Sequence, residues 1–352
     1  MTPQSLYDLD RSAWGELLHQ EPKFRVDQIW NGLYHQGKEL GELTSLPKAL
    51  REQLLEQLPT ALNKVTEQVS DSGDTTKFLW ELSGGARVET VLMLYPDRAT
   101  VCISSQAGCA MACSFCATGQ AGFERQLSTG EIVEQVLRAR RVAMAQQPAR
   151  RVSNIVFMGM GEPMANFENT WAAVQRIHDD IEIGARHITV STVGLIPGIH
   201  RMAAEALPVN LAVSLHAADN TLRNELVPIN RKYPLEDLMA ACASYFAATR
   251  RRVSFEWAMI HDVNDRLSDA QALAELAHPL RAHINLIPLN PTPGYAVRGS
   301  SKNRVRAFRE ELERLGINVT VRDTRGTEID AACGQLRAGH EATPVSRPQR
   351  RS

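Results

Sequence analysis

A cysteine-rich segment decides the fold, and it reads Cys102-Ile-Ser-Ser-Gln-Ala-Gly-Cys109-Ala-Met-Ala-Cys113-Ser-Phe-Cys116. Its last three cysteines have the spacing C-x3-C-x2-C, and a β-strand is expected just before them, over residues 100–104. Three thiolates in one loop can ligate three irons of a [4Fe-4S] cubane and leave the fourth iron open to a substrate. We therefore expect Cys109, Cys113 and Cys116 to hold such a cluster at the carboxyl end of a sheet, where α/β sites lie.

A structural zinc site is the alternative for these cysteines. Zinc in structural sites takes four protein ligands, so a fourth cysteine or histidine would have to lie nearby. The nearest upstream candidate is Cys102, which falls inside the expected strand. The spacing therefore favours a cluster with one open iron, although spacing alone fixes a metal only weakly.

Strands and helices alternate downstream of the cysteines. Strands are expected over residues 154–158, 187–191, 210–214, 253–260, 283–288 and 318–322. Helices are expected over residues 128–145, 166–181, 234–248, 268–277 and 302–315. This alternation indicates a parallel sheet with crossover helices. About six repeats are too few for an eight-unit barrel, so the predicted fold is α/β, an open, partial (β/α)6 barrel.

The chain divides into four expected parts. Residues 1–62 carry apolar residues at helical spacing and are expected to form a helical accessory domain. Residues 63–98 alternate as strands around a turn at Gly84-Gly85 and form a β extension. Residues 99–335 form the core, and the polar, arginine-rich residues 336–352 are expected to be a disordered tail.

Composition describes an ordinary soluble protein of 352 residues, with 43% apolar and 22% charged residues. It lacks both a long apolar run and a signal peptide, so we expect a cytoplasmic protein with no membrane partner. The formal net charge of −1 means that any nucleic-acid surface is a local patch. There are 32 arginines and only 7 lysines; arginine suits phosphate and base contacts, but a GC-rich genome explains the bias equally well.

The cysteine spacing, with Phe115 before the last cysteine, resembles the radical S-adenosylmethionine (SAM) superfamily. In that superfamily SAM chelates the open iron and is cleaved to a 5′-deoxyadenosyl radical. Polar or glycine residues follow several expected strands at the same sheet edge, and together they suggest a lined SAM pocket. These residues are Gly161, Glu162, Ser191, Ser214, Leu215, His216 and Asn290.

A closer resemblance runs from about Phe24 to Leu336, to the RlmN/Cfr family of radical SAM adenosine methyltransferases that modify RNA. Matching stretches begin at Arg87, Cys102, Gly159, Ser214, Val227 and Ala331. One departure is Thr327-Glu328-Ile329, where the family usually has aspartate before isoleucine. The resemblance implies a methyl carrier at Cys333, a second thiol at Cys102 and a proton acceptor at Glu89.

The chemistry implied by the resemblance uses two SAM molecules. One methylates Cys333, and a radical from the other activates that methyl group for addition to adenine. Glu89 then removes the ring proton, and Cys102 resolves the protein–RNA crosslink by forming a disulfide bond. Cys242 is different, because it lies on an apolar helix stripe with Leu238 and is expected in the core.

The implied substrates are 23S rRNA, at the peptidyl-transferase centre, and tRNA, beside the anticodon. The expected partners also include an electron donor such as flavodoxin or ferredoxin, and the protein is expected to be a monomer. Methylation at C2 of adenosine is the leading interpretation, and C8 methylation, as in the Cfr-like branch, is the nearest alternative. A non-catalytic iron–sulfur protein that binds RNA or transfers electrons is the third.

Overall fold

The computed structural model describes residues 5–289, 298–322, 325–326, 329–331 and 335–336. Two predicted site residues, Asn290 and Cys333, and nearly all of the expected tail lie outside the described residues. None of the described helices is long and apolar enough to cross a membrane.

Within the described part of the chain, one large sheet has the strand order β1-β2-β3-β4-β7-β8-β9-β10-β11-β12. Its bounds are β1 Asn63–Ser70, β2 Thr75–Glu81, β3 Arg87–Leu94, β4 Ala99–Cys102, β7 Val152–Phe157, β8 Ile188–Thr192, β9 Asn210–Ser214, β10 Val253–Met259, β11 His283–Pro288 and β12 Val319–Val321. Neighbours from β4 to β12 pair in parallel, whereas β1 to β4 pair antiparallel. The predicted α/β class and partial barrel are confirmed.

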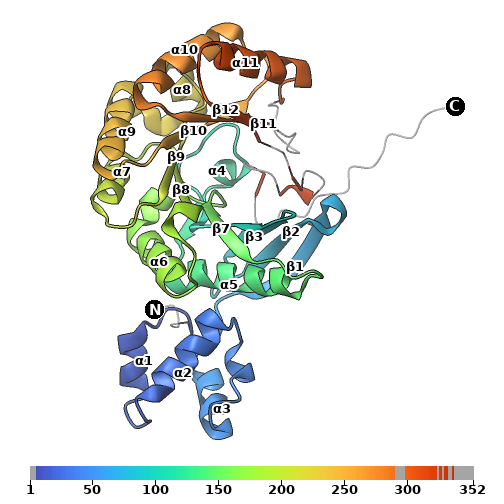
Figure 1. Ribbon diagram of the computed structural model, residues 1–352, viewed down its shortest axis with the longest axis vertical. Helices are drawn as coiled ribbons and strands as arrows, with labels where there is room; N and C mark the ends of the chain where they lie inside the picture. The colour runs from blue at the N-terminus through green and yellow to red at the C-terminus, as the bar shows by residue number, and fades with distance from the viewer. Residues whose placement is uncertain (1–4, 290–297, 323–324, 327–328, 332–334, 337–352) are drawn as a thin grey trace, which may run out of the picture.

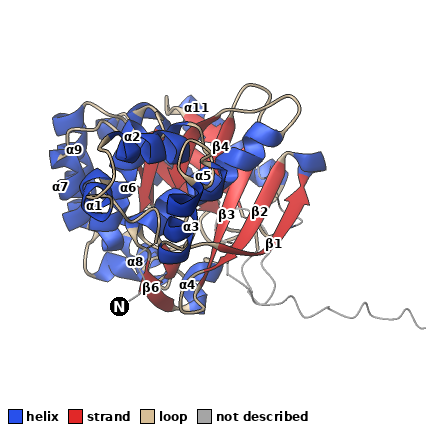
Figure 2. Ribbon diagram, turned by 90° about the horizontal axis from the view of Figure 1, so that it is seen from below, coloured by secondary structure: helices blue, strands red, loops and turns tan. Residues whose placement is uncertain are grey.

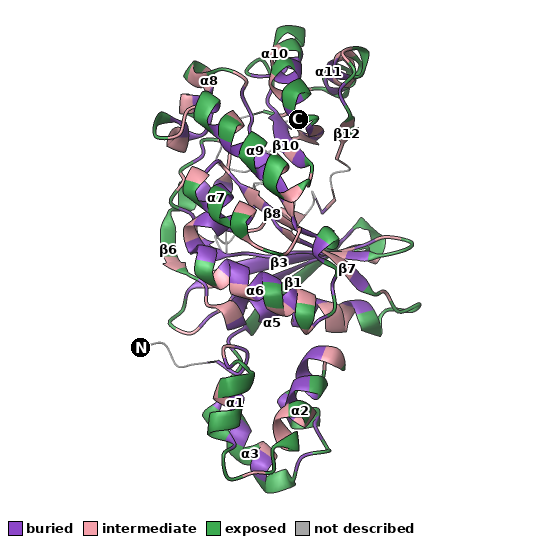
Figure 3. Ribbon diagram, turned by 60° about the vertical axis from the view of Figure 1, so that its left-hand side comes forward, coloured by how far each residue is buried: buried purple, intermediate pink, exposed green. Residues whose placement is uncertain are grey.

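The helices lie outside the curved sheet, and the short helix α4 (Ala117–Ala121) lies inside the curve (Figure 1). The outer helices are α5 Thr129–Ala145, α6 Phe167–Asp179, α7 Ile196–Ala204, α8 Asn220–Leu226, α9 Leu235–Thr249, α10 Leu267–Ala277 and α11 Lys302–Arg314. Their exposed residues lie on the outer surface, and the strands behind them are mostly buried (Figure 3). This is the arrangement that crossover helices on a parallel sheet require.

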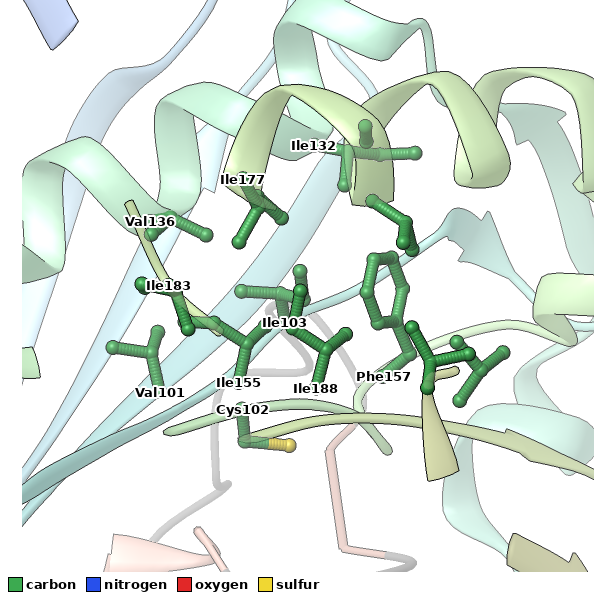
Figure 4. Close-up of a cluster of buried hydrophobic side chains, with 14 of the residues drawn as sticks. Val101, Cys102, Ile103, Ile132, Val136, Ile155, Phe157, Ile177, Ile183 and Ile188 are labelled. Carbon is green, nitrogen blue, oxygen red and sulfur yellow. The ribbon is translucent and has the colours of Figure 1, made fainter. Parts of the chain in front are cut away.

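The core between helices and sheet follows from strand alternation. Ile132 on α5 and Ile177 on α6 face Val101 on β4 and Ile155 on β7 (Figure 4). The sulfur of Cys102 points away from this cluster, because successive side chains of a strand point to opposite faces. Cys102 therefore points into the concave, inner side of the barrel.

The strands β1, β2 and β3 continue the sheet side by side at one edge (Figure 2). The turn between β2 and β3 contains Gly84 and Gly85 with φ of +90° and +86°, as the sequence predicted for a hairpin. A second, two-stranded sheet pairs β5 (Gln106–Gly108) with β6 (Phe123–Gln126) around the cysteine loop. Sequence patterns did not predict β5, β6, α4, α7 or α8, which are all nine residues long or shorter.

The N-terminal helices are α1 (Arg11–Leu17), α2 (Phe24–Trp30) and α3 (Lys48–Gln57), and a π-helical turn follows α2. This unit lies beside α5 and α6 (Figure 1). Arg140 on α5 donates to the carbonyls of Tyr34 (2.7 Å) and His35 (2.9 Å). Trp30 donates its indole N–H to Asp180 at 2.8 Å. Side-chain hydrogen bonds thus fix the helical unit to the barrel.

Candidate functional site

A cavity opens at the carboxyl ends of the parallel strands and has about 980 Å³ of atom-free space, part of it open to solvent. We call it the barrel pocket. Its lining includes Cys109, Cys113, Cys116, Thr118, Met158, Gly159, Gly161, Glu162, Ser191, Val193, Ser214, His216, Glu256 and Leu336. The structure therefore brings together all three predicted cluster ligands and five of the seven predicted SAM-site residues. Of the other two, Asn290 lies outside the described residues, and Leu215 does not line the pocket.

The cysteine loop suits an iron–sulfur cluster. Burial raises the pKa of Cys109 to about 12 and that of Cys113 well above its usual value, so these thiols stay protonated until a metal replaces the proton. Among the described residues, no three His, Cys, Asp or Glu side chains are grouped closely enough to hold a metal ion. Three thiols spread around one cavity fit a larger group such as a cubane better than a single zinc ion.

The glycine loop after β7 needs its glycines because it packs closely against the chain between β4 and β5. A Cβ at Gly159 would lie 2.6 Å from the carbonyl oxygen of Ile103. Gly161 has φ of +99°, and its Cβ would lie 2.5 Å from the Cβ of Gln106. Glycine at both positions lets the loop backbone line the barrel pocket.

Glu162 is buried and fixes this loop to the end of β8. Its Oε1 accepts from the N–H of Met164 at 3.0 Å, and its Oε2 accepts from the N–H of Val193 at 2.8 Å. Burial raises its pKa to about 7 in spite of these bonds. The carboxylate thus positions two pocket segments, in addition to any contact with an ammonium group.

The two serines lie on the inner side of the sheet. Ser191 donates its hydroxyl to the carbonyl of Phe157 at 2.6 Å, and Ser214 pairs in register with Glu256. The side chain of Leu215 points the other way, into the hydrophobic core, and does not line the pocket. Strand alternation explains this difference. The backbone of Leu215 is bonded within the protein, because its N–H donates to the carbonyl of Glu256 at 3.0 Å and its carbonyl accepts from Arg223 at 3.1 Å.

His216 has φ of +61° and is buried beside the cysteine loop. Its Nδ1 accepts from the N–H of Ala258 at 3.0 Å, and its ring stands edge-on to Phe115 at 4.5 Å between centroids. Burial, with help from the positive charge of Arg223, lowers its pKa to about 3. His216 is therefore neutral and carries its proton on Nε2, where it can donate a hydrogen bond.

Cys102 and Glu89 face the same, inner side of the sheet. Val91 pairs with Cys102 across the strands, and Glu89 lies two residues before Val91 on β3, so all three share one face. Glu89 is buried and forms an ion pair with Lys77, with 3.4 Å between Nζ and Oε1. The predicted second thiol and the predicted base are thus close in the sheet, next to a buried cation.

Described residues on either side of Cys333 make contacts with this region. Lys77 donates to the carbonyl of Asp330 at 3.4 Å, and Thr118 donates to the carbonyl of Leu336 at 2.5 Å. Thr118 and Leu336 both line the barrel pocket. Asp330 therefore lies beside the Lys77–Glu89 pair, and Leu336 lies beside the cysteine loop.

Known proteins share both this architecture and the sequence. A family model described as the radical SAM superfamily matches residues 103–277. A solved radical SAM methyltransferase from Sphaerobacter thermophilus is 48% identical with a TM-score of 0.92, covering 96% of this chain and 100% of that one. A probable dual-specificity RNA methyltransferase RlmN from Chloroflexus aurantiacus is 51% identical, covering 98% of this chain and 96% of the relative. The relative of that name from Salinispora tropica is 49% identical, covering 96% and 94%.

The chain belongs to the RlmN family. It is a radical SAM RNA methyltransferase, and its cofactors are a [4Fe-4S] cluster and SAM. The match to these relatives spans nearly the whole chain and includes the helical N-terminal unit as well as the barrel.

Three further residues of this RlmN family member lie at or beside the site, and sequence patterns did not predict them. Glu256 lines the barrel pocket, with its Oε2 3.4 Å from Arg322. Lys77 pairs with Glu89, and Arg223 is fully buried behind the pocket. A charged residue within an otherwise apolar strand, such as Glu256 in Phe255–Met259, was the available signal.

Proposed function

We propose that this RNA methyltransferase methylates C2 of adenosine in 23S rRNA, at the peptidyl-transferase centre, and in tRNA, beside the anticodon. The observation that carries the proposal is the shared inner face of Cys102 and Glu89. The relatives that match the whole chain are described as dual-specificity RNA methyltransferases, which supports two RNA substrates.

Cys109, Cys113 and Cys116 would hold the cluster. Gly161, Glu162, Ser191, Ser214, His216 and Asn290 would hold SAM, and Leu215 would keep Ser214 and His216 in place through its packing in the core. The cluster and SAM together supply an alkyl radical by one-electron cleavage of SAM. The chain itself would orient SAM, through a neutral His216 and the two inner serines, and would exclude water from a largely apolar cavity.

The methyl group would reach the base through a cysteine thiol and not directly from SAM. C2 of adenine is an electron-poor aryl carbon, so it cannot displace a methyl group from SAM. Cys333 would accept that methyl group and lose one hydrogen atom from it to the radical, so that the methylene carbon can bond to C2. Once the adduct has lost one electron to the oxidised cluster and its C2 proton to a base, Cys102 would attack the sulfur of Cys333. The S–C bond then breaks, a disulfide forms, and the released carbon takes up a proton to become the methyl group of the product. The resulting disulfide needs two electrons from a reductant before the next turnover. The contacts of Asp330 and Leu336 support this assignment, because they tie the flanking chain to the region of Glu89 and the cysteine loop.

Glu89 would remove the proton from C2 once the crosslink has formed. A buried carboxylate held by Lys77 meets the geometric need of a base in a site that excludes water. Lys77 is then a positioning residue, since it contacts both Glu89 and the carbonyl of Asp330.

The RNA must present its target base out of its stack to reach the inner side of the barrel. We propose that phosphate and shape recognition dominate, with contacts from the helical N-terminal unit and from basic residues such as Arg231 and Lys232. Residues 1–62, 63–98 and 99–335 would act as accessory domain, β extension and catalytic core. We further propose a cytoplasmic monomer that takes electrons from a flavodoxin or ferredoxin.

The test is anaerobic turnover of the reconstituted protein on an rRNA fragment and on tRNA, followed by nucleoside analysis. The proposal predicts 2-methyladenosine in both RNAs. A product methylated at C8 would support the Cfr-like alternative and overturn the C2 assignment. Absence of 5′-deoxyadenosine and of any product would support a non-catalytic role.

A further inference from the structure

Arg223 on α8 is a fully buried cation, and the groups that accept its hydrogen bonds are all uncharged. Its Nε donates to the carbonyl of Leu215 at 3.1 Å, and its Nη1 donates to Oδ1 of Asn230 at 2.7 Å. Its Nη2 donates to the carbonyls of Val193 at 2.7 Å and Ser214 at 3.3 Å. Within the described residues, no carboxylate forms an ion pair with it, so its charge is hydrogen-bonded but not neutralised.

Such a charge is unusual in this protein. Arg125, Arg138 and Arg322 are only partly buried, and each pairs with a glutamate. A buried guanidinium without an anion carries a large desolvation cost, which an opposite charge in the same low-dielectric region offsets. Burial lowers the pKa of Arg223 only to about 10, so the side chain remains charged at neutral pH.

The cysteine loop is the neighbouring segment that could carry a negative charge opposite Arg223. Leu222, Leu226 and Val227 pack in one apolar cluster with Cys113, and the N–H of Ser114 donates to the carbonyl of Leu226 at 3.1 Å. Helix α8 therefore lies directly against the loop that would hold the cluster. Arg223 is close enough to interact electrostatically with Cys113 and His216, which both line the barrel pocket, and on its other side with Cys242 in the core.

We propose that Arg223 is the built-in countercharge of the iron–sulfur cluster and raises its reduction potential. Three thiolates give the cluster a net negative charge, and reduction adds one more. A fixed positive charge behind the loop stabilises the reduced state more than the oxidised state. Arg223 does not line the barrel pocket, so it would act on the cluster through its charge and not through contact. This role does not depend on whether C2 or C8 of adenine is methylated.

The test measures the midpoint potential of the reconstituted, SAM-free cluster in Arg223→Gln, Arg223→Met and Arg223→Lys. We expect both neutral variants to have a more negative potential and Arg223→Lys to stay near the wild type. Asn230→Ala is the matched control, because it removes a hydrogen bond from the guanidinium but no charge, and its potential should not move. A wild-type potential in the neutral variants overturns the proposal.

The iron content of each reconstituted variant is measured as well, because a variant that does not assemble the cluster has no potential to measure. If the neutral variants take up no iron while Arg223→Lys does, the charge is needed for assembly and the proposal stands. If Arg223→Lys also takes up no iron, the shape of the guanidinium matters instead of its charge, and the proposal fails. If the potential shifts only after SAM is added, the partner is the SAM carboxylate, which also overturns the assignment to the cluster.

Discussion

Glu162 and Arg223 hold the same residue of the pocket wall from its two sides. The carboxylate of Glu162 accepts from the N–H of Val193 at 2.8 Å, and the guanidinium of Arg223 donates to the carbonyl of Val193 at 2.7 Å. One is a buried anion from the glycine loop, and the other is a buried cation from α8. The segment after β8 is thereby fixed next to the site proposed for SAM and the cluster.

The stability of the cluster-free protein should fall as pH rises from about 4.5 to about 7 because of Glu162. Its pKa is raised from 4.5 to about 7, so its contribution is fully present below pH 4.5 and is lost as pH rises through 7. A shift of that size corresponds to about 3 kcal/mol. Denaturant unfolding of the wild type between pH 5 and 8 should show this slope, and Glu162→Gln should lack it. Equal slopes in both proteins would contradict this assignment.

Removing only one partner of the Lys77–Glu89 ion pair should lower the free energy of unfolding strongly. Lys77→Met leaves a buried carboxylate without its cation, and we expect a loss of about 3–5 kcal/mol in the free energy of unfolding. The double variant Lys77→Met/Glu89→Leu should recover much of that loss, since it removes both charges. Urea unfolding of the wild type, Lys77→Met, Glu89→Leu and the double variant completes the comparison. Additive losses in the double variant would show that the pair is not coupled.

Cys102→Ala should leave the protein covalently trapped on RNA. Without the second thiol the crosslink through Cys333 has no group to resolve it, so an RNA–protein adduct should accumulate on a denaturing gel. Cys242→Ala is the matched control, because Cys242 is buried in the core on α9 and should turn over normally. Normal product release by Cys102→Ala would remove Cys102 from the mechanism.

Arg140→Ala should weaken RNA binding and leave SAM cleavage intact. Arg140 holds the N-terminal unit through the carbonyls of Tyr34 and His35, and its loss should increase proteolysis within residues 5–62. RNA affinity should fall several-fold, while uncoupled 5′-deoxyadenosine formation stays unchanged. Arg314→Ala, which breaks an exposed pair with Glu311, should change neither quantity. Unchanged RNA affinity in Arg140→Ala would argue against a role of this unit in binding.

The sequence could predict the parallel strands and long helices because each carries a regular apolar pattern. β9 and β11 have the predicted bounds, and Cys242 lies in the core as expected. Helix α8 was missed because only Arg223 and Leu226 are buried in its seven residues, and an arginine breaks the apolar period. The contact between Lys77 and Glu89 depends on how β2 pairs with β3, and no local sequence pattern predicts it.

The pocket was predictable where a residue ends a strand on the inner face. Ser191, Ser214 and His216 line it, whereas the side chain of Leu215 does not, because alternation turns it into the core. Cys109, Cys113 and Cys116 lie together around the pocket, as their short spacing predicts, and their role as cluster ligands stays a prediction. The assignments of Cys333 and Asn290 rest on resemblance and stay predictions, since both lie outside the described residues.

The central claim is that the methyl group passes through Cys333, and isotope labelling tests it most directly. Protein incubated with SAM carrying a CD3 group, freed of that SAM, and then given RNA and unlabelled SAM should yield adenosine with a CD2H group in its first turnover. The lost deuterium should appear in 5′-deoxyadenosine. Cys333→Ala should give no methylated RNA. A fully unlabelled CH3 group in the first-turnover product would mean that SAM donates directly, and it would contradict the account.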